Sequence, residues 1–133
     1  MSLGDLIGRG NLVLYFYPKD RTPGCTAEAG AFKEAYGALR ERGAEVVGVS
    51  SDSVESHEGF AKECGLPFRI LSDEDGKLRR SFGVQSTAGI IPGRVTFIID
   101  KRGRVRHVFS SQFQATRHAK EALEFLDKMP EEP

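Results

Sequence analysis

The amino-acid sequence predicts an α/β protein in which helices pack on a mixed central sheet. Two observations lead to this fold class. Up to Phe82, short apolar runs rich in β-branched residues alternate with helical patterns, which is typical of parallel strands joined by helices. Two later apolar runs flank a short polar turn, which indicates an antiparallel hairpin ahead of a final helix.

The first half of the chain contains three predicted strands and three predicted helices. The strands are continuous apolar runs at residues 12–17, 44–49 and 68–71. The helices have apolar residues three or four positions apart, and they cover residues 26–40, Val54–Cys64 and 76–82. In the first of them, the apolar stripe consists of Phe32, Tyr36 and Leu39. Serines and an aspartate at residues 50–53 offer N-caps for the second helix, which Gly65 ends.

The second half adds the hairpin and one helix. Strands at residues 95–100 and Val105–Ser110 flank the turn Lys-Arg-Gly-Arg, and a helix at residues 116–128 follows. The inward-facing residues of that helix are Ala119, Ala122, Leu123 and Leu126. At 133 residues the chain fits one domain, residues 1–133, around a single core, and residues 129–133 are expected to form a flexible tail.

Composition excludes several classes of function. Nineteen basic and nineteen acidic residues cancel, so nucleic acid and membranes are not expected partners. Two cysteines do not make a disulfide scaffold and favour a reducing, cytoplasmic setting with a redox or catalytic role. No metal is expected, because His57, His107 and His118 are scattered and no C-x-x-C motif occurs.

The most informative segment runs from Tyr17 to Thr26 and contains the sequence Thr-Pro-Gly-Cys-Thr. A turn between the first strand and the first helix delivers Cys25 to the start of that helix. Unpaired backbone N–H groups and the positive end of the helix dipole favour an anion there, so they favour the thiolate. Because the thiolate is the nucleophilic form of cysteine, the sequence predicts a reactive sulfur at position 25.

At these residues the chain resembles a peroxiredoxin of the bacterioferritin-comigratory or Q type, over about residues 2–128. The resemblance depends on the pattern P-x-x-x-T-x-x-C from Pro18 to Cys25 and on a distant arginine, Arg94, just before a Thr-Phe strand. Residues 111–114 are similar to the branch found in cyanobacteria and plastids. The resemblance implies a thioredoxin-like three-layer sandwich with a mixed central sheet.

The resemblance also implies a role for each matching residue. Cys25 matches the peroxidatic cysteine that attacks a hydroperoxide, and Thr22 matches the threonine that hydrogen-bonds to thiolate and peroxide. Arg94 matches the arginine that favours the thiolate and stabilises charge on the peroxide oxygens. Pro18 matches the proline that walls the pocket, and backbone N–H groups of Gly24 and Cys25 bind the substrate. The structural alternatives are an inert cysteine, a simple N-cap, a surface arginine and a strand-ending proline.

The chain departs from the family pattern in two places. Many relatives carry a resolving cysteine five residues after the peroxidatic one, where this chain has Gly30. Cys64 is then either the resolving cysteine or a buried structural residue, and in the second case an outside thiol reduces the sulfenate. Relatives also place a β-hairpin before the first strand, and the chain is expected to lack it or to be truncated. If the chain is truncated, the missing N-terminal part could include a plastid-targeting segment.

The predicted function is a thiol peroxidase that reduces hydrogen peroxide and organic hydroperoxides through a cysteine sulfenate. The implied reductant is thioredoxin or another thiol, no cofactor is required, and a monomer or weak dimer is expected. A thioredoxin-type reductase is excluded because Glu28 stands where the second cysteine of its motif belongs. The alternative from another class is a non-catalytic binding or chaperone-like module.

Overall fold

The structure is a computed structural model, and it describes residues 10–18, 20, 22–82, 94–111 and 114–128. Its strands are β1 (Asn11–Phe16), β2 (Ala44–Ser50), β3 (Arg69–Ser72), β4 (Val95–Ile99) and β5 (Val105–Ser110). Its helices are α1 (Pro23–Glu41), α2 (Val54–Cys64), α3 (Lys77–Ser81) and α4 (Arg117–Lys128).

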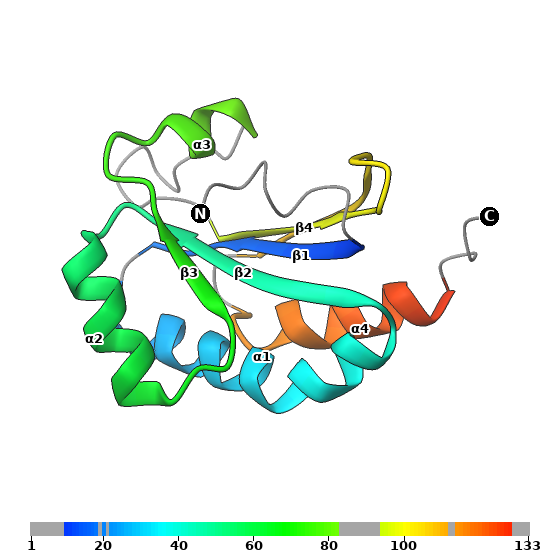
Figure 1. The fold of residues 1–133 in the computed structure, drawn as a ribbon, viewed down its shortest axis with the longest axis horizontal. Helices are drawn as coiled ribbons and strands as arrows, with labels where there is room; N and C mark the ends of the chain where they lie inside the picture. Colours follow the sequence, from blue (N-terminus) through cyan, green and yellow to red (C-terminus); the bar gives the residue numbers. More distant parts are fainter. Residues whose placement is uncertain (1–9, 19, 21, 83–93, 112–113, 129–133) are drawn as a thin grey trace.

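The strands form one mixed sheet in the order β3-β2-β1-β4-β5, with β1 at its centre. β1, β2 and β3 are parallel, whereas β4 is antiparallel to both β1 and β5. Helices α1, α2 and α4 cover one face of the sheet and α3 lies on the other (Figure 1). This arrangement confirms the predicted thioredoxin-like α/β sandwich with a mixed sheet.

The side chains of β1 alternate between two apolar layers, as the two-residue period of a strand requires. Val13 and Tyr15, together with Tyr17 just after the strand, pack against the layer formed with α1 and α4. The intervening residues Leu12, Leu14 and Phe16 pack with β2, β4 and partly buried residues of α3. The sheet therefore divides the predicted single core into two clusters, because both of its faces are covered.

The predicted boundaries agree with the structure to within one residue, except at the start of α1. That helix was expected to begin at residue 26 and instead begins at Pro23, with Thr22 as its N-cap. The Thr-Pro-Gly segment was interpreted as a turn. Proline is favoured at the first helical position, because its φ is already helical and its missing N–H would have no partner there. The correction places Cys25 inside the first turn of α1.

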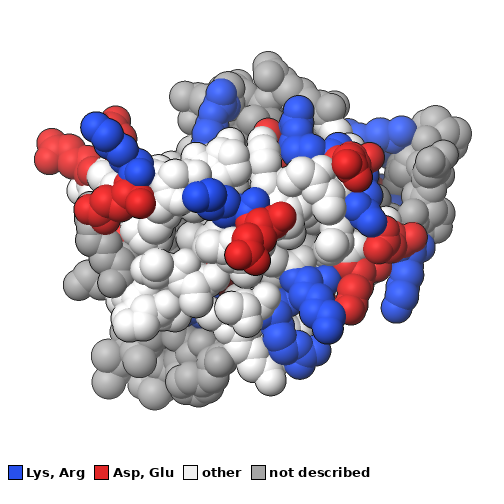
Figure 2. Space-filling model, turned by 90° about the horizontal axis from the view of Figure 1, so that it is seen from below, with Lys and Arg blue, Asp and Glu red and all other residues white. Residues whose placement is uncertain are grey.

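The remaining predictions about the fold fall partly outside the described residues. Neither the segment before Gly10 nor the predicted tail at residues 129–133 is described. None of the helices in the described ranges combines the length and apolar character needed to cross a membrane. On the face where α1 and α4 lie, acidic and basic side chains are interspersed (Figure 2).

A larger residue at Gly48 in β2 should destabilise the fold, because Gly48 lies against the ring of Tyr15. A Cβ at Gly48 would lie 2.8 Å from Tyr15 Cζ, and the buried Tyr15 ring stacks on Phe32 with centroids 4.4 Å apart. We expect Gly48→Ala to lower the free energy of unfolding by about 1–3 kcal/mol through overpacking. Urea denaturation measures this change.

Gly37 provides the matched control, since a Cβ there meets nothing within 4 Å and the residue lies inside α1. Gly37→Ala should raise the free energy of unfolding by about 0.5–1 kcal/mol, because glycine is a poor helix former. Equal effects of the two substitutions would contradict the assigned packing of Tyr15.

Candidate active site around Cys25

Cys25 lies in the first turn of α1, on the segment that follows the end of β1. Its side chain is buried, with 1% of the residue exposed. The Thr22 hydroxyl accepts a hydrogen bond from the Cys25 backbone N–H at 3.4 Å, and the first turn contains no acidic residue. The sulfur therefore lies at the positive end of the helix dipole, as the sequence predicts.

Arg94, which directly precedes β4, contacts this sulfur although it lies 69 residues later in the sequence. It is 5% exposed, and its Nη2 donates a hydrogen bond to Cys25 Sγ at 3.4 Å. Gly24 permits this approach, because a Cβ at that position would lie 3.1 Å from Arg94 Nη2. Cys25 and Arg94, which were predicted to belong to one site, are thus in contact.

The other end of the guanidinium binds Glu28, a site residue that the sequence did not predict. Arg94 Nη1 donates to Glu28 Oε1 at 2.5 Å, and Glu28 is completely buried. Glu28 lies three residues after Cys25, so both side chains project from the same face of α1. The signal that could have identified it is an acidic residue on the apolar face of a predicted helix.

Burial and charge act in opposite directions on the ionisation of this pair. Burial raises the pKa of Glu28 to about 8, although the charge of Arg94 and its hydrogen bond lower it. Burial lowers the pKa of Arg94, but the charges of Glu28 and Cys25 more than offset this, so the net shift is upward. Arg94 is therefore cationic at neutral pH, with an anionic or potentially anionic group on each side.

The model of the AhpC/TSA family matches residues 1–108. The chain belongs to the AhpC/TSA family. It is 50% identical over 119 residues to a chloroplastic peroxiredoxin Q of Sedum lineare, and 46% identical over 119 residues to one of Triticum aestivum. Each alignment covers 89% of this chain, which spans 64% and 55% of the length of these relatives, respectively.

Solved peroxiredoxin structures show the same fold. A peroxidoxin, BcpB, of Mycobacterium tuberculosis superimposes with a TM-score of 0.88 at 36% identity, over 97% of this chain and 86% of that one. The bacterioferritin comigratory protein of Xanthomonas campestris, studied for alkyl peroxide reduction, gives a TM-score of 0.87 at 34% identity, over 96% and 84% of the two chains. The predicted assignment to peroxiredoxins of the Q type is thereby confirmed.

Two more of the predicted site residues, Pro18 and Cys64, lie just beyond a strand and at the end of a helix, respectively. Pro18 is half-buried in a bend just beyond β1. Cys64 is the last residue of α2 and half-buried, and its carbonyl oxygen accepts a hydrogen bond from Lys33 Nζ at 3.0 Å. Both cysteines are free thiols. At Gly30, a Cβ would meet nothing within 4 Å.

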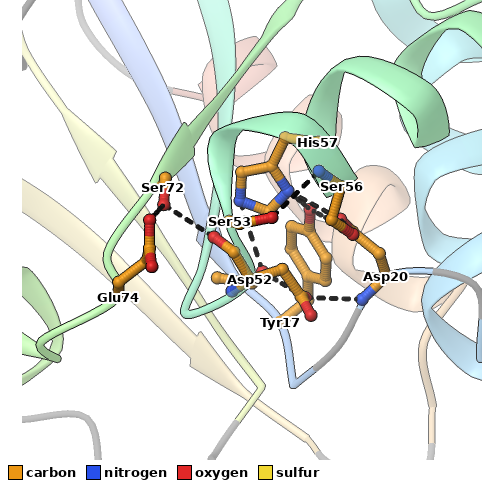
Figure 3. Close-up of polar contacts among 9 residues, drawn as sticks. Tyr17, Asp20, Asp52, Ser53, Ser56, His57, Ser72 and Glu74 are labelled. Carbon is orange, nitrogen blue, oxygen red and sulfur yellow. Dashed lines mark hydrogen bonds and ion pairs between the residues drawn. The ribbon is translucent and has the colours of Figure 1, made fainter.

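A buried polar network ties the segment that carries the site to the start of α2 (Figure 3). Asp20 Oδ1 accepts from the Tyr17 hydroxyl at 2.6 Å, and Oδ2 accepts from the Ser56 hydroxyl at 2.7 Å and pairs with His57 Nδ1 at 2.8 Å. Asp52 Oδ2 accepts from the Asp20 backbone N–H at 2.8 Å. The network thus ties Tyr17 and Asp20, which lie between β1 and α1, to residues at and just before the start of α2.

Three members of this network, Asp20, Asp52 and His57, have metal-ligand atoms within 4.8 Å of one another. Protein donors already occupy both carboxylate oxygens of Asp20, and the Asp52 oxygen also accepts from the Ser50 hydroxyl at 2.8 Å. Because the oxygens are engaged in this way, the cluster has the character of a structural hydrogen-bond network.

One cavity of about 360 Å³ lies at the opposite edge of the sheet from Cys25. It is lined by residues at the beginning of β1 and β2, including Asn11 and Glu45, and by Phe68 before β3. Cys25 follows the other end of β1 and does not line it. The chemistry of the Cys25 site, and not the size of a cavity, identifies the candidate active site.

Removing His57 should reveal a pH-dependent contribution to stability. Burial lowers the pKa of His57, but its hydrogen bond with Asp20 and the charge of Asp20 give a net rise. Burial raises the pKa of Asp20, but hydrogen bonds from His57, Tyr17 and Ser56 give a net decrease. The pair therefore stabilises the fold most between the unfolded pKa values of Asp and His, about pH 4 to 6.5.

We expect His57→Gln to cost about 1–3 kcal/mol in this window, because the Asp20 carboxylate loses a buried partner. The cost should shrink as the pH rises through the elevated pKa of His57. Urea denaturation of both proteins across the pH range measures it. His107→Gln is the control, since it removes a half-exposed pair with Glu121. A cost that stays the same as the pH rises from this window to well above the pKa of His57 would refute the ionised pair.

Proposed function

We propose that this protein is a thiol peroxidase that reduces hydrogen peroxide and small organic hydroperoxides at Cys25. The contact that carries the proposal is the 3.4 Å hydrogen bond from Arg94 Nη2 to Cys25 Sγ in a buried site. A cation next to the sulfur, at the start of a helix, favours the thiolate. Membership of the AhpC/TSA family supports the same activity.

The proposed reaction begins with attack of the Cys25 thiolate on the terminal oxygen of the hydroperoxide. An S–O bond forms as the O–O bond breaks, and water or an alcohol leaves after taking up a proton. The sulfur loses two electrons to become a sulfenic acid, and the peroxide gains them. The electrons come from sulfur alone, so the step needs no metal, haem or flavin.

The neighbouring groups supply charge stabilisation and position. Arg94 stabilises the negative charge that moves from sulfur to the departing oxygen, which is the effect of preorganised donors in an oxyanion hole. The Thr22 hydroxyl accepts from the Cys25 N–H and caps α1, and we assign it contact with the peroxide as well. Pro18 is assigned to the pocket wall. Gly24 leaves space for the guanidinium, and its N–H is a further donor to substrate.

Regeneration requires a second thiol, which displaces water from the sulfenic acid and forms a disulfide with Cys25. Two routes are available. Cys64 supplies this thiol after the first turn of α1 unwinds, or a thiol from another molecule attacks directly. A dithiol reductant such as thioredoxin then reduces the disulfide. Such a cycle suits a compartment that keeps thiols reduced.

Arg94→Lys tests the group that activates the sulfur. Lysine keeps one positive charge but lacks the planar donors that bind Cys25 and Glu28 at the same time. We expect the rate of Cys25 oxidation by hydrogen peroxide to fall about 10²–10³-fold, the range for losing an oxyanion-type donor. Rapid mixing with peroxide followed by thiol labelling measures this rate.

Arg40→Lys is the matched control, because Arg40 is an exposed arginine paired with Glu45 at 3.1 Å. It should leave the rate unchanged. If wild-type Cys25 reacts no faster than free cysteine, the peroxidase proposal fails and a non-catalytic module remains.

Cys64→Ser separates the two routes of regeneration. If Cys64 is the resolving thiol, the wild type should form a Cys25–Cys64 disulfide after one equivalent of peroxide, and mass spectrometry should detect a loss of two hydrogens. The variant should then accumulate the sulfenic acid or a mixed disulfide, and its turnover with thioredoxin should fall. Cys25→Ser is the control that forms none of these products. Unchanged turnover in Cys64→Ser would assign the cycle to an outside thiol.

A further inference from the structure

One carboxylate oxygen beside the active site has a neighbour but no hydrogen bond. Glu28 Oε1 accepts from Arg94, whereas Oε2 is buried and has no hydrogen-bond partner among the described residues. Nδ1 of His118 on α4 lies 3.6 Å from this oxygen. An unpartnered buried carboxylate oxygen costs free energy, so this pair needs an explanation.

The hydrogen bonds of His118 define which of its nitrogens carries hydrogen. Nε2 lies 2.9 Å from the carbonyl oxygen of Ser111, which can only accept, so Nε2 carries the hydrogen. In neutral imidazole Nδ1 is then an acceptor, and the Thr96 hydroxyl lies 2.7 Å from it. The Thr96 hydroxyl can donate to the one lone pair of Nδ1, but without an additional proton neither Glu28 nor His118 offers a hydrogen to the buried Oε2.

The sum of the charges in the site also indicates that the Glu28–His118 pair holds an additional proton. Arg94 contributes one positive charge, while the Cys25 thiolate and an ionised Glu28 contribute two negative charges. This buried group would carry a net negative charge, which opposes the thiolate. One proton held between Glu28 and His118 makes the group neutral.

We propose that Glu28 and His118 together hold one proton beside Arg94, and that His118 thereby directs the charge of the arginine toward the Cys25 thiolate. His118 is in this sense a positioning residue, since it acts through Glu28 and Arg94. The proposal about the proton stands on the geometry of the pair. Its consequence for catalysis rests on the peroxidase function proposed above.

The ionisation of the surrounding groups agrees with this assignment. Burial raises the pKa of Glu28 to about 8, and it lowers that of His118 to about 4, with the charge of Arg94 adding to the decrease. Both shifts favour placing the shared proton on Glu28 rather than on His118. From β1, Tyr15 faces Glu28 and Cys25, and burial keeps it un-ionised. Glu121 on α4 raises the pKa of His118 slightly against these effects.

Two substitutions separate a shared proton from simple packing. Glu28→Gln keeps an oxygen for Arg94 and places a fixed N–H₂ group toward His118, so it imitates the protonated acid. His118→Asn offers an amide N–H to Glu28 Oε2 and stabilises the carboxylate, so the proton should leave at lower pH. His107→Gln is the control, because His107 pairs with Glu121 and not with Glu28.

Infrared spectroscopy tests the proton without reference to activity. At neutral pH the wild type should show the carbonyl absorption of a protonated carboxylic acid that is missing from Glu28→Gln, identified in the difference spectrum. The band should disappear as the pH rises, and it should do so at lower pH in His118→Asn but not in His107→Gln. Absence of the band at neutral pH, or an unaltered titration in His118→Asn, would overturn the proposal.

The rate of Cys25 oxidation by hydrogen peroxide tests the consequence. The rate should fall as the band is lost, because the ionised Glu28 competes with the thiolate for Arg94. If His118→Asn lowers the affinity of Glu28 for the proton about tenfold, it should react about twofold more slowly at neutral pH and about tenfold more slowly near pH 9, where both proteins have largely lost the proton. Glu28→Gln should remove the alkaline decrease, and adding His118→Asn to it should have no further effect. A further decrease in the double variant would assign His118 to packing alone.

The two proposals fail in different ways. If the wild-type rate equals that of free cysteine, the peroxidase function is wrong, yet the infrared titration still decides whether the proton is present. If the rate is high but its pH dependence is the same in all four proteins, the peroxidase function stands and the proton-holding pair is refuted.

Discussion

The structure around Cys25 depends on one buried cation, the guanidinium of Arg94. A buried arginine is tolerated only when its charge and its donors are matched, and two groups of α1 match them here: the Cys25 sulfur and the Glu28 carboxyl group. The guanidinium thereby joins the chain before β4 to the first turns of α1. The same contacts that stabilise the buried charge place it beside the sulfur, so the packing of Arg94 and its proposed role in activation depend on one arrangement.

That arrangement requires the start of α1 to be fixed, and the network around Asp20 fixes it. Asp20 binds the Tyr17 hydroxyl at the end of β1 and the imidazole of His57 on α2, while its N–H binds Asp52. The connection between β1 and α1 is therefore tied to the first turn of a neighbouring helix. Loops seldom position catalytic groups without such support, and here buried ionic hydrogen bonds provide it.

Local patterns predicted most of the fold, because the signals lie close together in sequence. Ser53 caps α2 and Gly65 ends it in a left-handed conformation, so both ends of that helix were predicted. The start of α1 was not, because a Pro-Gly pair fits a turn as well as a first helical turn. The contact of Cys25 with Arg94 followed from family resemblance, whereas Glu28 and His118 were missed. Glu28 on α1 contacts Arg94 before β4 and His118 on α4, and these residues are far apart in the sequence. The periodicity of a single helix or strand gives no information about such long-range contacts.

Because Cys25 is buried, Cys64 can form a disulfide with it in the proposed cycle only after a local structural change. The sulfur is enclosed by its own helix turn and by Arg94, and the hydrogen bond from Lys33 to the Cys64 carbonyl ties α1 to the end of α2. A disulfide needs Cα atoms within roughly 7 Å and a free approach to the sulfur, so the first turn must open. In the proposed cycle, oxidation would favour this opening, because a protonated sulfenic acid no longer holds the guanidinium by charge. Arg94, the donor proposed to activate the thiolate, would then lose its charge contact once the thiolate has reacted.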